Sequence, residues 1–231
     1  MHHWTLDEGA YAGPEHLDPA YVAIYEQKAG FDPVEDIEIL RREGLNPSSV
    51  VVDMGAGTGV FTAAVAPLCR QVIAVDVSPA MTEALRAKVG ALLLGNVTVV
   101  QAGFLSYDHQ GGAADFVFSR HALHQIPDFW KGIALGRVAS MLRRGGVLRL
   151  RDLVFDFEPA EADRKIAQWL AGAATDPALG FTAEELATHV RAEFSTYSWL
   201  MEAMLERVGF TIVDRSYRRS AYGAYTCVRM G

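Results

Sequence analysis

Short apolar runs alternate with helix-length segments between residues 50 and 152, and this alternation constrains the fold more than any other feature. The runs are rich in β-branched and aromatic residues, and they occupy Val50–Asp53, Val72–Asp76, Val97–Gln101, Asp115–Ser119 and Val147–Asp152. Strands that repeat with crossover helices form a parallel sheet that is covered on both faces. The sequence therefore predicts an α/β fold.

The segments between the runs carry helix signals. Apolar residues from Val60 to Leu68 form one stripe, and Ser78 followed by Pro79 is typical of a helix start. Asp128 is expected to cap a third helix that ends at Gly145-Gly146, before the fifth strand.

The two ends of the chain differ from this repeating unit. Residues 14–44 predict two helices, placed where they can cover a site as a lid. Thr182 and Glu185 predict a capping box with a helix to Arg191, and a second helix follows over Leu200–Val208. Phe210–Tyr217 and Tyr222–Arg229 should pair as an antiparallel hairpin. We expect one domain over residues 1–231: an N-terminal helical cap (1–44), a cofactor-binding half (45–152), and a helical insert plus hairpin (153–231).

Composition excludes several classes of protein. The chain has 231 residues, is 50% hydrophobic and carries a formal net charge of −7, which fits a globular protein and argues against a nucleic-acid substrate. Cys69 and Cys227 have no paired spacing, so two free thiols are expected. Without a signal-peptide pattern or an apolar membrane span, we expect a cytoplasmic monomer or homodimer that does not contact a membrane.

A glycine-rich turn follows the first predicted strand. Gly55, Gly57 and Gly59 let a ligand approach the backbone, whereas an empty turn would cost conformational entropy without a gain in packing. Val60 breaks the dinucleotide pattern G-x-G-x-x-G. Asp53 at the strand end would repel a pyrophosphate and attract an ammonium or sulfonium group. S-adenosylmethionine (SAM) carries both cations.

The second strand ends in another carboxylate, Asp76. An aspartate there can accept two hydrogen bonds from a ribose diol. NAD would use the same feature, and an isolated aspartate at a strand end is often only a turn residue. Together with Asp53 and the glycines, Asp76 indicates a ribose site.

Four segments resemble the ordered motifs of class I SAM-dependent methyltransferases, and the resemblance covers residues 45–152. The segments are Val51–Gly59, Val75–Met81, His121–Asp128 and Leu142–Leu148. The resemblance implies a Rossmann-like seven-stranded sheet, mostly parallel, with one antiparallel C-terminal strand and helices on both faces.

The resemblance also implies roles for individual residues. Asp53, Gly55, Ala56 and Gly57 would border the methionine part of SAM, and Asp76 would bind the ribose. Val77 and Met81 would flank the adenine. The family often has an aspartate after the third strand, but this chain has Gln101-Ala102-Gly103-Phe104, so backbone groups of Gly103 and Phe104 would contact the adenine instead.

The segment after the fourth strand would face the sulfonium and the acceptor, because ligands lie at the carboxyl ends of such strands. Ser119 and Arg120 are assigned to the cofactor. His121 and His124 are candidate general bases, with packing or capping at a helix start as the alternative. No metal is expected, because no Asp, Glu or Cys converges on these histidines locally and the resemblance implies none.

The function that we expect is methyl transfer from SAM, which becomes S-adenosylhomocysteine (SAH), to a small-molecule acceptor. Six aromatic residues are candidates for the acceptor pocket or for ordinary core: Trp4, Tyr11, Tyr25, Phe31, Trp169 and Trp199. Two alternatives remain open, a SAM-binding accessory protein without transfer activity and an NAD-dependent oxidoreductase.

Overall fold

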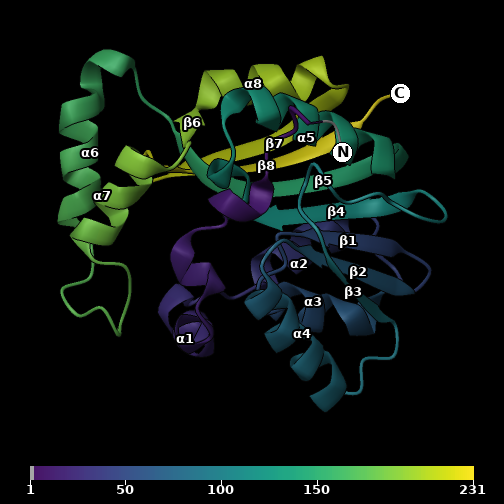
Figure 1. The fold of residues 1–231 in the computed structure, drawn as a ribbon. Coiled ribbons are helices and arrows are strands. Elements are labelled where there is room, and N and C mark those ends of the chain that lie inside the picture. Colours follow the sequence, from purple (N-terminus) through teal and green to yellow (C-terminus); the bar gives the residue numbers. More distant parts are fainter. Residues whose placement is uncertain (1–2) are drawn as a thin grey trace.

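One sheet organises the chain in the computed structural model, which describes residues 3–231 (Figure 1). Its order is β3-β2-β1-β4-β5-β8-β7, and a short strand, β6, pairs with the end of β5. The strands are β1 (Val50–Met54), β2 (Gln71–Asp76), β3 (Val97–Gln101), β4 (Ala114–Arg120), β5 (Leu142–Phe155), β6 (Thr196–Tyr197), β7 (Phe210–Arg218) and β8 (Tyr222–Arg229).

The strand directions confirm the predicted fold class. β1 to β5 run parallel to one another, and β8 runs antiparallel to both β5 and β7. The C-terminal hairpin is also confirmed. β6 was not predicted, because two residues are too short for a pattern to be recognised.

Helices cover both faces of the sheet, as Figure 1 shows. On one face α5 (Asp128–Met141) and α8 (Ser198–Arg207) pack against inward side chains such as Val52 and Met54. On the other face α2 (Val34–Arg42) and α3 (Val60–Val65) pack against Val51 and Phe118. Neighbouring residues of β1 thus point to opposite cores, which is why all five residues of the strand are buried and all but Asp53 are apolar.

Two predicted helix starts are confirmed and one is wrong. Ser78 caps α4 (Pro79–Ala91) by accepting the Met81 N–H at 3.1 Å, and Thr182 and Glu185 form the capping box of α7 (Ala183–Ala192). Asp128, however, is the first residue of α5 instead of its cap.

The end of α5 also differs from the prediction. The helix stops at Met141, before Gly145-Gly146, because Leu142 already pairs with Ala114 of β4. The carboxylate of Asp128 instead contacts the Lys131 ammonium and the Thr196 hydroxyl.

An insert formed by η5 (Pro159–Glu161), α6 (Ala162–Ala171) and α7 lies beyond the carboxyl end of β5 (Figure 1). It has a small core of its own, in which Trp169 and Leu186 pack with Leu153 and Phe155 of β5. The insert therefore stands beside the edge of the sheet where the strands β1, β2 and β4 end.

The N-terminal cap reaches the same edge. It contains η1 (Glu8–Tyr11), η2 (Pro14–Leu17), α1 (Pro19–Ala29) and α2, so the two helices expected over residues 14–44 are confirmed; residues 1 and 2 lie outside the described part. Lys28 of α1 forms an ion pair with Glu185 of the insert. Asp36 of α2 is fully buried and pairs with Arg149 and Arg151 of β5, at 2.9 and 2.6 Å.

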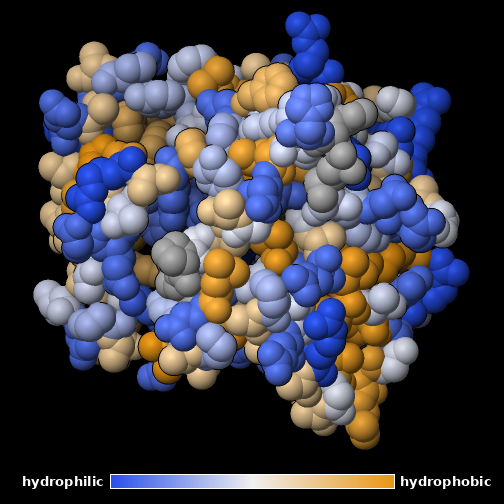
Figure 2. All heavy atoms as spheres, viewed as in Figure 1, coloured by the Kyte–Doolittle hydropathy of each residue, from blue (hydrophilic) through white to orange (hydrophobic). Residues whose placement is uncertain are grey.

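The surface in this view is mainly hydrophilic, with hydrophobic residues gathered at the lower right, where α4 lies (Figure 2). Leu92 and Leu93, just after α4, are 55% and 89% exposed. Cys69 and Cys227 are free and buried. Within residues 3–231, no helix combines the length and the apolar character that crossing a bilayer requires.

Candidate active site

Three cavities open where β1, β2 and β4 end. The first cavity, of about 90 Å³, lies between Asp76, Met81 and Gly103 on one side and His121 on the other. The second, of about 280 Å³, lies between the cap and the insert. The third, of about 50 Å³, lies behind the glycine turn (residues 55–59). Parallel α/β sheets bind ligands at this edge.

The three glycines of the turn differ in what a side chain at each position would contact. Gly55, Gly57 and Gly59 all have positive φ, at 73°, 54° and 84°. A Cβ at Gly55 would lie 2.3 Å from the Ala122 Cβ, and one at Gly59 would lie 2.0 Å from Leu85. At Gly57 the nearest atom would be 3.9 Å away. The expectation that the glycines gain no packing was therefore wrong for two of them, whereas a Cβ at Gly57 would meet only the Tyr25 ring, at van der Waals distance.

Asp76 lies at the end of β2 and faces the first cavity. Its carboxylate accepts the N–H of Gly57 at 2.8 Å and the N–H of Ser78 at 2.9 Å. Burial raises its pKa. Since a carboxylate can accept about four hydrogen bonds, acceptor capacity remains for a ligand. Val77 and Met81 line the same cavity, as the sequence predicted for one binding region.

Asp53 lies on the opposite side of the glycine turn, against the third cavity, which Ala56 also lines. It is 2% exposed and accepts the Thr62 hydroxyl at 2.6 Å. Burial, with a smaller contribution from the charge of Asp76, raises its pKa to about 7. A nearby cation would return this carboxyl to its ionised form.

The end of β4 contributes two buried hydrogen-bonding groups, the Ser119 hydroxyl and the Arg120 guanidinium. Ser119 Oγ and Arg120 Nε have no hydrogen-bond partner among the described residues. The Arg120 guanidinium lies over the Phe31 ring, 4.1 Å from its centroid, and lines both the first and the third cavity. Burial lowers the pKa of Arg120. Because buried donors are almost always paired in folded proteins, a buried cationic donor at a cavity wall fits an anionic ligand group.

The loop after β3 is held by a residue that sequence reasoning missed. Gly103 and Phe104 line the first cavity, and the next two N–H groups, of Leu105 and Ser106, donate to the Glu8 carboxylate at 2.9 and 3.1 Å. Burial raises the pKa of Glu8. No local pattern could indicate this contact, since the partners are almost 100 residues apart.

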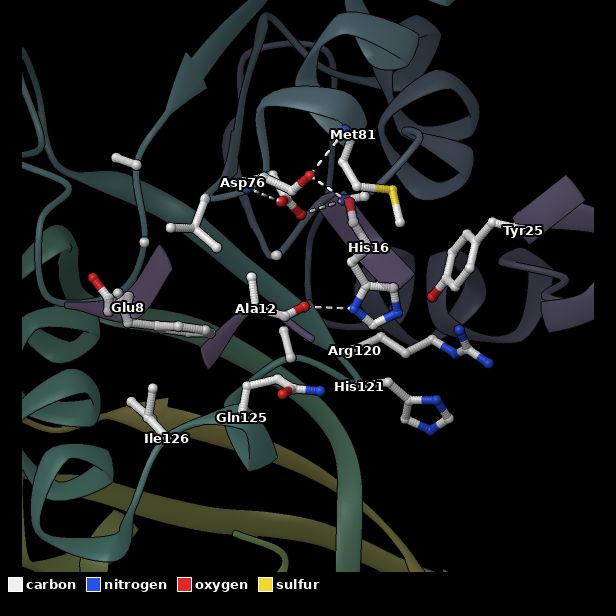
Figure 3. A pocket seen from close by; sticks show the side chains of 18 residues that line it. Glu8, Ala12, His16, Tyr25, Asp76, Met81, Arg120, His121, Gln125 and Ile126 are labelled. Atoms are coloured by element: carbon white, nitrogen blue, oxygen red, sulfur yellow. Dashed lines mark hydrogen bonds between the residues drawn. The ribbon is translucent and has the colours of Figure 1, made fainter. Parts of the chain in front are cut away.

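His121 lines both the first and the second cavity. Its φ is +49°, which is unusual for a residue with a side chain, and strained backbone of this kind often marks a functional site. Burial, and then the charge of Arg120, lowers its pKa well below the usual value, so the imidazole is neutral near pH 7. Figure 3 shows Asp76 and Met81 on one side of the first cavity, Arg120, His121 and Gln125 on the other, and His16 between them.

His124 is held differently. Its Nδ1 lies 2.5 Å from Asp152 Oδ1, and its Nε2 lies 3.3 Å from Glu193 at the end of α7. Burial alone would lower its pKa, but the two carboxylates outweigh this and raise the pKa to about 9. The sequence treated His121 and His124 as equivalent, whereas the structure places only His121 at the first cavity.

The second cavity is lined mainly by rings from the cap and the insert. Of the six aromatic candidates, Tyr25 lines all three cavities and Phe31 lines the third, but Trp4, Tyr11, Trp169 and Trp199 line none of them. Trp169 belongs to the insert core. The rings that do line it, besides Tyr25, are Tyr21, Phe181, Tyr222 and the imidazoles of His16, His121, His124 and His189.

Comparison with known proteins agrees with this geometry. A methyltransferase-domain family model matches residues 51–146. An uncharacterized methyltransferase of Exiguobacterium sibiricum is 31% identical over 202 residues, covering 87% of this chain and 82% of that protein.

Solved structures show the same fold. A SAM-dependent methyltransferase from Aquifex aeolicus has a TM-score of 0.62 at 18% identity and covers 91% of this chain and 97% of its own. Magnesium protoporphyrin IX methyltransferase from Synechocystis PCC 6803, with bound SAM, has a TM-score of 0.66 at 16% identity and covers 99% and 100%.

The chemical groups of the site suit this cofactor. Gly57 leaves room for a ligand at the backbone, and the Asp76 carboxylate can accept further hydrogen bonds. The buried donors Ser119 Oγ and Arg120 Nε have no acceptor among the described residues. The chain therefore belongs to the class I SAM-dependent methyltransferases, with SAM as its cofactor.

Proposed function

We propose that the chain transfers a methyl group from SAM to a small-molecule acceptor held in the second cavity, and that cap, sheet and insert act as a single domain. The observation that carries the proposal is that His16, Tyr25 and His121 line both the first and the second cavity. A cofactor in the first cavity and an acceptor in the second would therefore meet at these side chains. The second cavity, about 280 Å³, is near the lower end of the range for small-molecule sites, about 300 to 1,000 Å³.

The cofactor would span the first and third cavities on either side of Gly57. Asp76 would accept the ribose hydroxyls, Val77 and Met81 would flank the adenine, and backbone groups of Gly103 and Phe104 would contact its edge.

The remaining assigned residues would hold the methionine part. Arg120 would bind its carboxylate, and Ser119 with Asp53, Gly55, Ala56 and Gly57 would border the rest. The first and third cavities, about 90 and about 50 Å³, are smaller than the usual range for small-molecule sites, so their walls would widen on binding. SAM supplies the electrophilic methyl group when bound.

His121 is the residue best placed to act on the acceptor. Its neutral imidazole lies between the two cavities, so it can accept a proton from an acceptor or orient it by a hydrogen bond. The carboxylates of Asp152 and Glu193 raise the pKa of His124 to about 9, so this imidazole is already protonated near pH 7 and cannot readily accept another proton. If the acceptor arrives deprotonated, proximity alone carries the reaction.

The net charge supports a small-molecule acceptor. At −7 the chain offers little to neutralise a nucleic-acid backbone. Neither alternative function gains support from the relatives, which are described as methyltransferases and not as oxidoreductases or accessory proteins.

A transfer experiment tests the proposal. SAM with a labelled methyl group is incubated with the chain and, in turn, a metabolite extract, bulk RNA and bulk protein, and we expect label only in the metabolite fraction. Label in RNA or protein, or no transfer despite SAM binding, would contradict the proposal.

Matched variants on α7 then locate the acceptor. Thr188 lines the second cavity, so Thr188→Trp should fill it and reduce transfer while SAM affinity stays unchanged. Val190 is 39% exposed on the same helix and lines neither cavity, so Val190→Trp should transfer normally. Equal transfer by the two variants would place the acceptor elsewhere.

A further inference from the structure

Three potential metal ligands converge at the wall of the second cavity. They are His124, on the 3-10 turn η4 (Leu123–Gln125) after β4, His189 on α7, and Glu193 at the end of α7. One ligand atom of each lies within 4.8 Å of the other two. We call these three residues the His–Glu cluster. No metal was expected because no Asp, Glu or Cys converges on His124 locally and the family resemblance implies none, but folding brings in two ligands from more than 60 residues away.

The first observation in favour of a cation is the support behind His124. The 2.5 Å contact between its Nδ1 and Asp152 directs the opposite nitrogen, Nε2, towards Glu193. Asp152 is 1% exposed and is itself fixed by the N–H groups of Leu123 and Leu153, at 2.8 and 2.7 Å. Histidines that bind metals usually donate their other ring nitrogen to a carboxylate in this way, which fixes the tautomer and orients the ring.

The second observation is the balance of charge. Asp152 and the half-buried Glu193 place two carboxylates beside two histidines, and a divalent cation would neutralise them with both imidazoles uncharged. His189 and Glu193 are four residues apart, so they share one face of the helix end, and His189 Nδ1 contacts Glu193 Oε2. Gln125, which lines the first cavity, lies 3.2 Å from His124 Nε2 and 3.3 Å from Glu193.

We propose that the His–Glu cluster binds a divalent transition-metal cation, of which Zn²⁺ is the model, with an open coordination position facing the second cavity. Two imidazole nitrogens and one carboxylate oxygen form a donor set of catalytic zinc sites, where the fourth position is kept for water or substrate. All three ligands line the second cavity, together with His121 and Tyr222. Binding of the cation does not depend on the proposed function, whereas coordination of an acceptor by the cation does.

A cation here would define the acceptor class. An acceptor oxygen or sulfur at the open position would lose its proton more readily, because a bound divalent ion strongly lowers the pKa of its ligand. The acceptor would then be a compound with a hydroxyl or thiol group. Its proton would pass to His121 or to water, its oxygen or sulfur would form the bond to the methyl carbon of SAM, and the bond from that carbon to the sulfonium sulfur would break to release SAH.

The test measures metal binding directly, without SAM and without an acceptor, so its failure and the failure of the proposed function are distinguishable. Untagged protein is dialysed against a chelator and titrated with Zn²⁺ by calorimetry and with Co²⁺ by visible absorption. We expect one equivalent to bind and the Co²⁺ bands of a four- or five-coordinate site to appear.

Variants tie the signal to the cluster. His189 and Glu193 lie at the end of α7. The variants His189→Gln and Glu193→Gln should each remove the Co²⁺ bands and weaken Zn²⁺ binding at least about 100-fold. Asp152→Asn should weaken Zn²⁺ by about 10- to 100-fold while keeping the Co²⁺ bands. His109, a half-buried histidine on the loop between β3 and β4, supplies the control His109→Gln, which should bind as wild type.

Circular dichroism checks that each variant is folded. Binding of less than one equivalent by the wild type, or equal affinity in the wild type and the two ligand variants, would overturn the proposal.

Discussion

Replacing Asp76 by Asn tests the ribose assignment with almost no change in shape. The carboxylate already accepts two backbone N–H groups, from Gly57 and Ser78, and would accept two ribose hydroxyls as well. An amide keeps one acceptor oxygen and turns the other into a donor, so one backbone N–H faces another donor and the hydroxyls lose a charged partner.

The expected loss follows from the bonds involved. Hydrogen bonds to a charged group contribute about 1.5 to 3 kcal/mol each, and the two ribose bonds are weakened but not fully lost, so SAM binding should fall by about 2 to 4 kcal/mol. This corresponds to roughly 30- to 1,000-fold in Kd. Calorimetric titration with SAM measures it.

Two measurements make this result interpretable. Asp214, exposed on β7 and remote from the cavities, gives the control Asp214→Asn, which changes the charge equally and should bind normally. Thermal unfolding without SAM shows whether Asp76→Asn keeps its fold, because the Gly57 and Ser78 bonds also support the turn. A folded Asp76→Asn protein with wild-type affinity would refute the ribose assignment.

Four further predictions follow from the same structure. Gly57→Val should weaken SAM at least about 100-fold, while Gly44→Val, which has positive φ but lies outside the cavities, should bind normally; similar affinities would refute the role of the turn. Asp53, with its pKa raised to about 7, should ionise when the cationic cofactor binds, so SAM affinity should rise between about pH 5 and 7 with proton release, and Asp53→Asn should abolish that release in calorimetry. Asp36→Ala leaves the buried Arg149 charge unpaired and should lower the free energy of unfolding, measured in urea, by about 3 to 5 kcal/mol; a decrease below about 1 kcal/mol would contradict the buried pair. His121→Ala should retain SAM affinity and lose about 10²- to 10⁴-fold in turnover if it is the base, and a change of only a few-fold would leave proximity as the mechanism.

Much of the fold was predictable because its signals are local. The apolar runs of β1 to β5, the capping residues Ser78 and Thr182, and the C-terminal hairpin all depend on neighbours in sequence. The end of α5 was placed too late, since the extended conformation of Leu142 depends on pairing with β4, which the residues around it do not show.

The candidate site divides in the same way. The residues on the loops after β1, β2 and β4 were predictable, because strand ends of a parallel sheet meet at one edge. Glu8, Asp152, His189 and Glu193 were not, since each acts through a partner far away in sequence. His121 and His124 looked alike as a pair three residues apart, and only their buried surroundings separate them.

A crystal structure with bound SAH would show directly where the cofactor lies relative to the second cavity. We expect the ribose hydroxyls on Asp76, the adenine between Val77 and Met81, the carboxylate at Arg120, and the sulfur directed past His121 into the second cavity. SAH bound away from the glycine turn, or with its sulfur turned away from His121 and closed off from the second cavity, would contradict it.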